Sequence, residues 1–115
     1  MLDETKYESA MQMIMHAGNA KSSALLAIDD AAEGDFAAAE TDLAEAAAEM
    51  HSAHDLQLSL IQQEASGTPV ELSLILVHAE DHLTMAILAT DMATRMVELY
   101  RRLPAAAAGE KDDVA

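Results

Sequence analysis

The sequence predicts an all-α protein folded as a three-helix up-down-up antiparallel bundle, and three observations lead to this fold class. Helix-favouring residue types dominate, chiefly Ala, Leu, Met, Glu and Gln, whereas the 115 residues include four Gly, two Pro, one Phe and no Trp. Two short breaks, at residues 34 and 67–69, divide the chain into three long segments. Apolar residues recur within each segment at the spacing of one helix face.

The first two helices are expected at about residues 3–32 and 35–65, on either side of Gly34. Asp35 is a natural N-cap for the second helix, because its side-chain oxygen can accept a hydrogen bond from a backbone N–H of the first turn. The third helix is expected at about residues 69–103. Thr68 is its candidate N-cap and Pro69 suits its first position.

A chain of this length is large enough for one hydrophobic core, so we expect a single domain at residues 1–103. Pro104 ends the third helix, and residues 104–115 are expected to form a disordered acidic tail.

The apolar stripe of the third helix comprises Leu74, Val77, Met85, Leu88, Met92, Met96 and Leu99. Apolar residues beyond one stripe per helix are Met13, Met15, Leu26, Leu56, Leu58, Ile75 and Ile87. This apolar surface is more than a monomer would cover, which predicts self-association.

The charge of the chain restricts its partners. The net charge is −15, and residues 22–94 contain 14 Asp and Glu but no Lys or Arg. Such a surface repels phosphate backbones and anionic lipid, so we expect no nucleic-acid partner and favour a basic protein partner.

The chain has no cysteine. The N-terminal residues MLDETKYES do not resemble a secretory signal, and no apolar stretch reaches the ~18 residues of a membrane span. We therefore expect a cytoplasmic protein without membrane insertion.

The stretch LILVHAEDHLTM at residues 74–85 places polar groups inside an apolar helix pattern. His82 follows His78 at i+4 and Asp81 follows it at i+3, so the three side chains share one helix face. Clusters of titratable groups of this kind are candidate functional sites. Two chemistries fit this one. A neutral imidazole can accept a phosphoryl group while a second imidazole donates a hydrogen bond to it. Alternatively, both imidazoles can bind a metal with Asp81 as a third ligand.

Other chemistries have less support. A zinc-protease helix would need a glutamate where this chain has Ala79, and no Glu-x-x-His pair of the di-iron type occurs. No Ser or Cys nucleophile is set up beside a histidine, and HAGNAKS is not a nucleotide-binding loop. Taken singly, His16, His51 and His54 are most simply structural histidines.

The order of several motifs resembles a known family. MIMHAGNAKS, EGDFAAAETDLAEA, AHDLQLSLIQQEASG and VELSLILVHAEDHLTMAIL follow one another over about residues 11–102. The chain in this respect resembles the lactose/cellobiose-type enzyme IIA component of the bacterial phosphoenolpyruvate-dependent sugar phosphotransferase system (PTS). The resemblance implies that His78 takes a phosphoryl group from phospho-HPr, and that enzyme IIB receives it for uptake and phosphorylation of a β-linked disaccharide of the lactose, cellobiose or chitobiose class. We expect His82 to assist His78.

The resemblance also implies a homotrimer of nine helices. Asp81 matches the family's metal-binding position at the trimer axis, and we expect one Mg²⁺ per trimer there. Carboxylates that converge at an axis must share protons or bind a cation, and a hard divalent ion suits oxygen ligands. The chain departs from the family pattern at Glu80, where glutamine is usual, and at Thr84, where methionine is common.

Two alternatives belong to other classes of protein. A histidine phosphotransfer domain of two-component signalling is also a helical bundle, but its HxxKG signature does not follow His78. A non-catalytic metal-binding helical scaffold would need a tight metal site and would carry no labile phosphoryl group.

Overall fold

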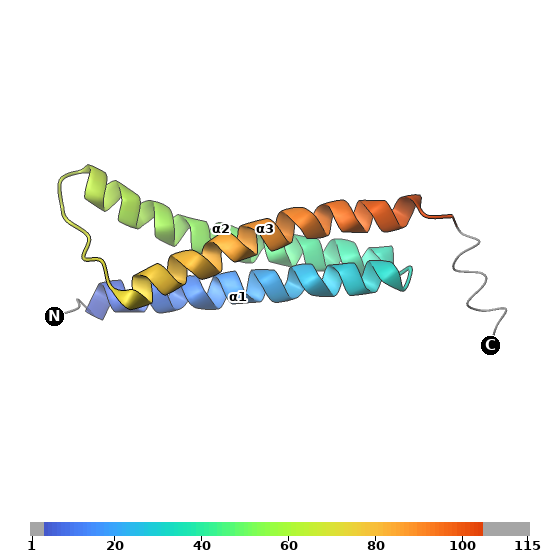
Figure 1. The fold of residues 1–115 in the computed structure, drawn as a ribbon, viewed down its shortest axis with the longest axis horizontal. Coiled ribbons are helices and arrows are strands. Elements are labelled where there is room, and N and C mark those ends of the chain that lie inside the picture. The colour runs from blue at the N-terminus through green and yellow to red at the C-terminus, as the bar shows by residue number, and fades with distance from the viewer. Residues whose placement is uncertain (1–3, 105–115) are drawn as a thin grey trace.

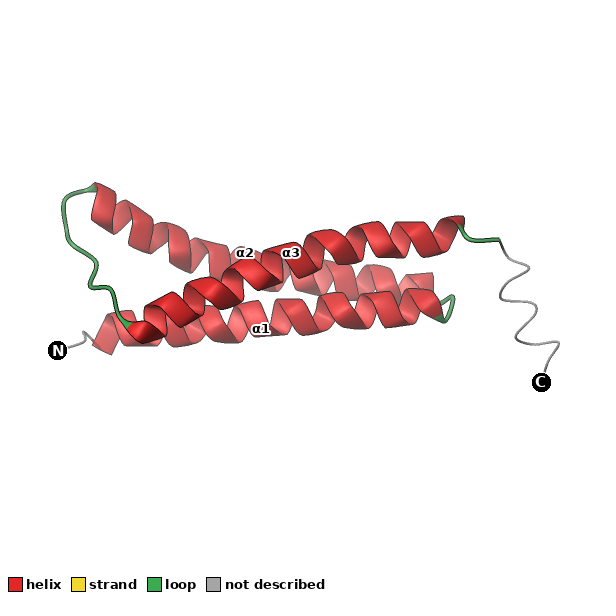
Figure 2. Ribbon diagram, viewed as in Figure 1, coloured by secondary structure: helices red, strands yellow, loops and turns green. Residues whose placement is uncertain are grey.

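The computed structural model describes residues 4–104 and contains three helices (Figures 1 and 2). Helix α1 spans Glu4–Ala32, α2 spans Phe36–Ala65 and α3 spans Leu74–Arg102. Successive helices run in opposite directions along the long axis, so the predicted all-α, three-helix up-down-up arrangement is confirmed. None of these helices is long and apolar enough to cross a membrane.

The turn between α1 and α2 forms as the sequence predicts. Gly34 has a φ of 83°, a left-handed conformation that glycine adopts without steric cost. The Asp35 side chain accepts a hydrogen bond from the backbone N–H of Ala38 at 3.1 Å. This N-cap satisfies one of the unpaired donors of the first turn of α2.

The predicted start of α3 at residue 69 is wrong, because the helix begins at Leu74. Ser73 is the N-cap, and its side chain accepts a hydrogen bond from the backbone N–H of Leu76 at 3.2 Å. Residues 68–73 instead form an extended connection, in which Val70 is half-buried against the core. A helix over this segment would forgo the Ser73 cap and would move Val70 from its packed position.

At its other end α3 stops at Arg102, and Leu103 is extended, with φ −69° and ψ 145°. This is the conformation that a residue before proline prefers, so Pro104 acts as predicted. The tail expected at residues 104–115 lies outside the described residues apart from Pro104.

Small side chains on α1 form the centre of the bundle. Helix α1 packs along both α2 and α3, whereas α2 and α3 contact each other over a much smaller surface. The buried positions of α1 alternate in steps of three and four residues: Ala10, Met13, Ala17, Ala20, Ala24, Ala27 and Ala31. This is a coiled-coil seam, and alanine at its positions lets the helices approach closely. At its C-terminal end α2 diverges from the other helices (Figure 1).

The apolar stripe predicted for α3 does not face this core. All seven of its residues are exposed in the single chain, from Met96 at 37% to Leu74 at 86%. The inner face of α3 consists instead of Leu76, Ala79, Leu83, Ala86, Ala93 and Val97. The helix therefore has two apolar faces, and the alanine-rich one is inside because it permits the shorter distance to α1. Among the additional apolar residues, Met13 is buried but Met15, Leu26, Leu58 and Ile87 are exposed.

Leu83 provides a test of this packing, because its side chain is fully buried in the cluster formed by α1 and α3. We expect Leu83→Ala to lower the free energy of unfolding by about 2–5 kcal/mol, through lost apolar contacts and a cavity. Urea denaturation monitored by circular dichroism measures the change. Thr84→Ala is the matched control at the next, exposed position and should change stability by less than about 0.5 kcal/mol. A similar loss in both variants would contradict the assigned inner face.

Candidate functional site

Helix α3 holds the two predicted site histidines against each other near its N-terminal end. The Nε2 atoms of His78 and His82 are 3.1 Å apart, and their ring centroids are 4.5 Å apart with the rings nearly perpendicular. The i, i+4 spacing on a continuous helix produces this contact. His78 is exposed and His82 is partly buried. The prediction that these two side chains lie together is therefore correct.

The contact restricts the protonation of the pair. Since both closest atoms are Nε2, one ring must donate an N–H and the other must present a lone pair. A neutral, exposed imidazole is a nucleophile, and a neighbouring N–H can donate to a group that becomes attached to it.

An open apolar recess lies beside the exposed histidine. It has a volume of about 460 Å³ and is lined by Leu74, Ile75 and His78. Leu74 is 86% exposed in the single chain, an unusual position for a large aliphatic side chain. The exposed His78 imidazole therefore lies at the edge of an apolar surface.

Asp81 does not join the two imidazoles. It is exposed, and within residues 4–104 it makes no hydrogen bond or ion pair. The described residues also contain no group of three or more His, Cys, Asp or Glu that could hold a metal ion. This result does not support the alternative in which one chain binds a metal through His78, His82 and Asp81. Asp81 lies instead on the exposed apolar face of α3, one turn from Val77 and from Met85.

Glu80, the departure from the usual family motif, is paired with a side chain of α2. Gln57 donates a hydrogen bond from Nε2 to Glu80 Oε2 at 2.5 Å, and both residues are partly buried. The bond joins α2 to α3 close to the point where α2 diverges. Glu80 also lines a cavity of about 150 Å³ together with apolar residues of α2, the 68–73 connection and α3.

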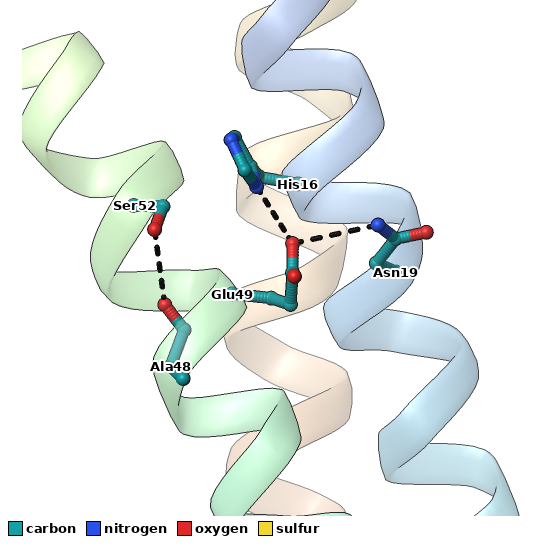
Figure 3. A network of polar contacts seen from close by, with 5 residues as sticks. All are labelled: His16, Asn19, Ala48, Glu49 and Ser52. Atoms are coloured by element: carbon teal, nitrogen blue, oxygen red, sulfur yellow. Dashed lines mark hydrogen bonds and ion pairs between the residues drawn. The ribbon is translucent and has the colours of Figure 1, made fainter.

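A second polar network links α1 to α2 (Figure 3). Glu49 lies 2.7 Å from Nδ1 of His16 and also accepts a 3.5 Å hydrogen bond from Asn19. No local sequence signal pairs residues that are 30 or more positions apart, so sequence reasoning could not find this network. His51 lies 3.4 Å from Asp55 on the exposed face of α2, and His54 is exposed. These contacts agree with structural or surface positions for the three remaining histidines.

Comparison with known proteins identifies the class to which this bundle belongs. Residues 8–101 match the family described as PTS system, Lactose/Cellobiose specific IIA subunit. The chain belongs to this family, as its motifs predict, and it is a PTS enzyme IIA component. This membership favours the phosphotransferase interpretation over a two-component signalling domain or a metal-binding scaffold.

Individual relatives agree over most of their length. The lichenan-specific phosphotransferase enzyme IIA component of Bacillus subtilis is 42% identical over 102 residues, which cover 89% of this chain and 93% of the relative. The crystal structure of the cellobiose-specific enzyme IIA from Bacillus anthracis superimposes with a TM-score of 0.83 at 35% identity, covering 89% of this chain and 93% of that one. A solution structure of the Escherichia coli IIA(Chitobiose)–HPr complex has a TM-score of 0.72 at 36% identity, covering 83% and 92%.

The pairing of Glu80 leads to a prediction about its substitution. We expect Glu80→Gln to change the free energy of unfolding by less than about 0.5 kcal/mol, because an amide oxygen can accept the same bond from Gln57. Glu80→Ala should cost about 1–3 kcal/mol, since it leaves the partly buried amide of Gln57 unpaired. Urea unfolding of the three proteins measures both effects. Equal stability of the alanine and glutamine variants would show that the bond contributes nothing.

Proposed function

We propose that this protein is a phosphoryl carrier that accepts a phosphoryl group from phospho-HPr on His78 and passes it to enzyme IIB, for the uptake and phosphorylation of a β-linked disaccharide. The observation that carries this proposal is the exposed His78 imidazole in contact with His82. The names of the relatives, which refer to lichenan, cellobiose and N,N'-diacetylchitobiose, support the substrate class.

The proposed chemistry needs only these two side chains and the two partner proteins. A neutral nitrogen lone pair of His78 attacks the phosphorus atom, and the bond from phosphorus to the donor protein breaks as the new N–P bond forms. His82 donates an N–H to a phosphoryl oxygen and so stabilises the charge that develops. In the second transfer the N–P bond breaks toward a nucleophile of enzyme IIB. Catalysis by the carrier is then mainly positioning, for which α3 is a rigid support.

Charge and surface composition support HPr as the donor. The E. coli relative forms a complex with HPr, and that structure superimposes on this chain. Residues 22–94 carry 14 acidic and no basic residues, a field that would speed encounter with a basic protein surface. The apolar recess at Leu74 and Ile75 lies beside His78. A carrier must release each partner quickly, so a modest interface is expected.

The exposed face of α3 supports a homotrimer in which the three α3 helices surround a central axis. This face carries seven large apolar residues, which three copies would bury against one another. Asp81 lies in the middle of the same face, about 60° around the helix from His78. A central position for Asp81 therefore leaves His78 toward the side, where a partner protein can approach.

Asp81 fits a metal at that axis. Its carboxylate is exposed and makes no hydrogen bond or ion pair within residues 4–104, although apolar residues surround it on the helix face. Three such carboxylates would hold one Mg²⁺ through oxygen ligands, with water completing the coordination. The ion would neutralise charge and support assembly, and it would take no part in phosphoryl transfer.

His78→Ala tests the acceptor. After incubation with phosphoenolpyruvate, enzyme I and HPr, we expect intact-mass measurement under non-acidic conditions to find one acid-labile phosphoryl group per wild-type chain and none in His78→Ala. His51→Ala and His54→Ala serve as controls that keep the adduct. His82→Ala should still be phosphorylated but should transfer to enzyme IIB more slowly, because a donor to the phosphoryl group is lost. A full adduct on His78→Ala would refute the assignment.

Asp81→Leu tests the axial metal by sedimentation velocity. We expect EDTA to weaken the wild-type trimer, because three unneutralised carboxylates repel one another. The leucine variant should remain trimeric and should be insensitive to EDTA, and both proteins should still accept phosphoryl on His78. Dissociation of the leucine variant, or a wild-type trimer that is indifferent to the chelator, would count against the metal.

A further inference from the structure

One acidic residue occupies a position in the core seam. Asp42 of α2 lies between Ala39 and Ala46 at the i−3 and i+4 positions, on the face that packs against the other helices. It is only 8% exposed and is the one charged residue among the described residues that is buried. Its Oδ2 atom is inaccessible and has no hydrogen-bond partner within the described part of the chain. A buried carboxylate oxygen without a donor is strongly unfavourable, so this group must be stabilised in another way.

The neighbour of Asp42 is a second carboxyl group. The side chain of Asp30, near the end of α1, lies within hydrogen-bonding distance of the Asp42 side chain. Two ionised carboxylates have only acceptor atoms, and a hydrogen bond can form between them only when one of them carries a proton. The bond to Asp30 is the largest cause that raises the pKa of Asp42 from 3.8 to about 6, followed by burial.

The charged groups around the pair also favour the protonated form. Glu45 on α2 and Asp35 at its N-cap act on Asp42 with the same sign as Asp30, and each raises its pKa. The arginines of α3 are engaged elsewhere, because Arg101 pairs with Glu40, Arg102 pairs with Glu98, and Arg95 donates a hydrogen bond to the backbone oxygen of Asp91. No basic group of the described residues compensates Asp42.

We propose that Asp30 and Asp42 form a proton-binding site that joins the end of α1 to the start of α2. One proton is shared between the two carboxyl groups. The sign of the effect on stability follows from linkage. Between about pH 4 and pH 6 the folded state holds a proton that the unfolded state has released, so stability falls as the pH rises through this window. At neutral pH this site is deprotonated, and the two carboxylates of Asp30 and Asp42 face each other between α1 and α2.

This site is separate from the phosphoryl-transfer site. The turn between α1 and α2 lies at the opposite end of the bundle from the start of α3, where His78 is located (Figure 1). Protonation of the Asp30–Asp42 site therefore takes place far from the imidazole pair.

The test is urea unfolding at several pH values between 4.5 and 8, with full-length wild type, Asp42→Asn and Glu45→Gln at one protein concentration. Other carboxylates also titrate in this range, so the difference between proteins is the measured quantity. An asparagine amide donates to Asp30 at every pH. We therefore expect the wild-type unfolding constant to rise relative to that of Asp42→Asn by about 25-fold between pH 4.5 and pH 7.5. Glu45→Gln, an exposed neighbour, should keep most of the wild-type dependence.

Two results would overturn the proposal. One is an equal pH dependence of wild type and Asp42→Asn. The other is loss of the difference when millimolar Mg²⁺ or Ca²⁺ is added, which would make the pair a cation site. If Asp42→Asn does not fold, the carboxyl ¹³C shifts of wild type provide an independent readout. They should show an Asp42 midpoint well above that of an exposed aspartate, and an ordinary midpoint would refute the shared proton.

Discussion

The close approach of α1 to both of its neighbours is the constraint on which the rest of this structure depends. Six of the seven buried positions along α1 are alanines, and the facing positions of α3 include Ala79, Ala86 and Ala93. Short side chains allow the helix axes to come close, but each buries little apolar area. Apart from Met13, Leu76, Leu83 and Val97, many of the larger apolar side chains therefore remain outside the bundle, on the other face of α3 and on the outer face of α1. A core made largely of alanine thus leaves a large apolar surface exposed on the single chain.

The same constraint explains where the functional groups lie. Helix α1 packs along α3, whereas α2 diverges at its C-terminal end and remains joined to the first half of α3 by the Gln57–Glu80 bond. His78 thus projects from a well-supported helix into a region that no other helix covers. The proposed carrier function, with two different partner proteins, would use this combination of a rigid support and an open approach. The Gln57–Glu80 bond joins the diverging helix to the site without occupying the imidazole face.

The sequence predicted the fold class and the reactive pair because both depend on local spacing. Gly34, Asp35 and Pro104 act through their own backbone preferences, and His78 and His82 meet because they are one turn apart. The predicted start of α3 was wrong. Thr68-Pro69 and Ser73 are both good helix-start signals, and the packing of Val70 against the core favours the later start. The inner face of α3 was also missed, because hydrophobicity ranks leucine and methionine above alanine while close packing favours alanine.

Contacts between helices could not be predicted from the sequence alone. The His16–Glu49, Gln57–Glu80 and Asp30–Asp42 pairs each join residues that are 12 to 33 positions apart. Each depends on how far one helix is shifted along another, and a shift of one residue, about 1.5 Å, would turn these side chains about 100° away. The family motifs predicted the class of protein more fully than they predicted these pairs, since a motif records which residues are present but not what they face.

The surroundings of the two carboxylates Asp42 and Asp81 differ. At the α1–α2 turn the helices are close, Asp42 is enclosed, and a proton is the smallest group that can relieve the contact with Asp30. On the outer face of α3, Asp81 is exposed, which leaves room for the larger hydrated ion that we propose at a trimer axis. The free space around a carboxylate, rather than its residue type, thus decides whether a proton or a metal ion is the suitable counter-charge. In this protein that space is set by the side chains on either side, alanine around Asp42 and longer apolar residues around Asp81.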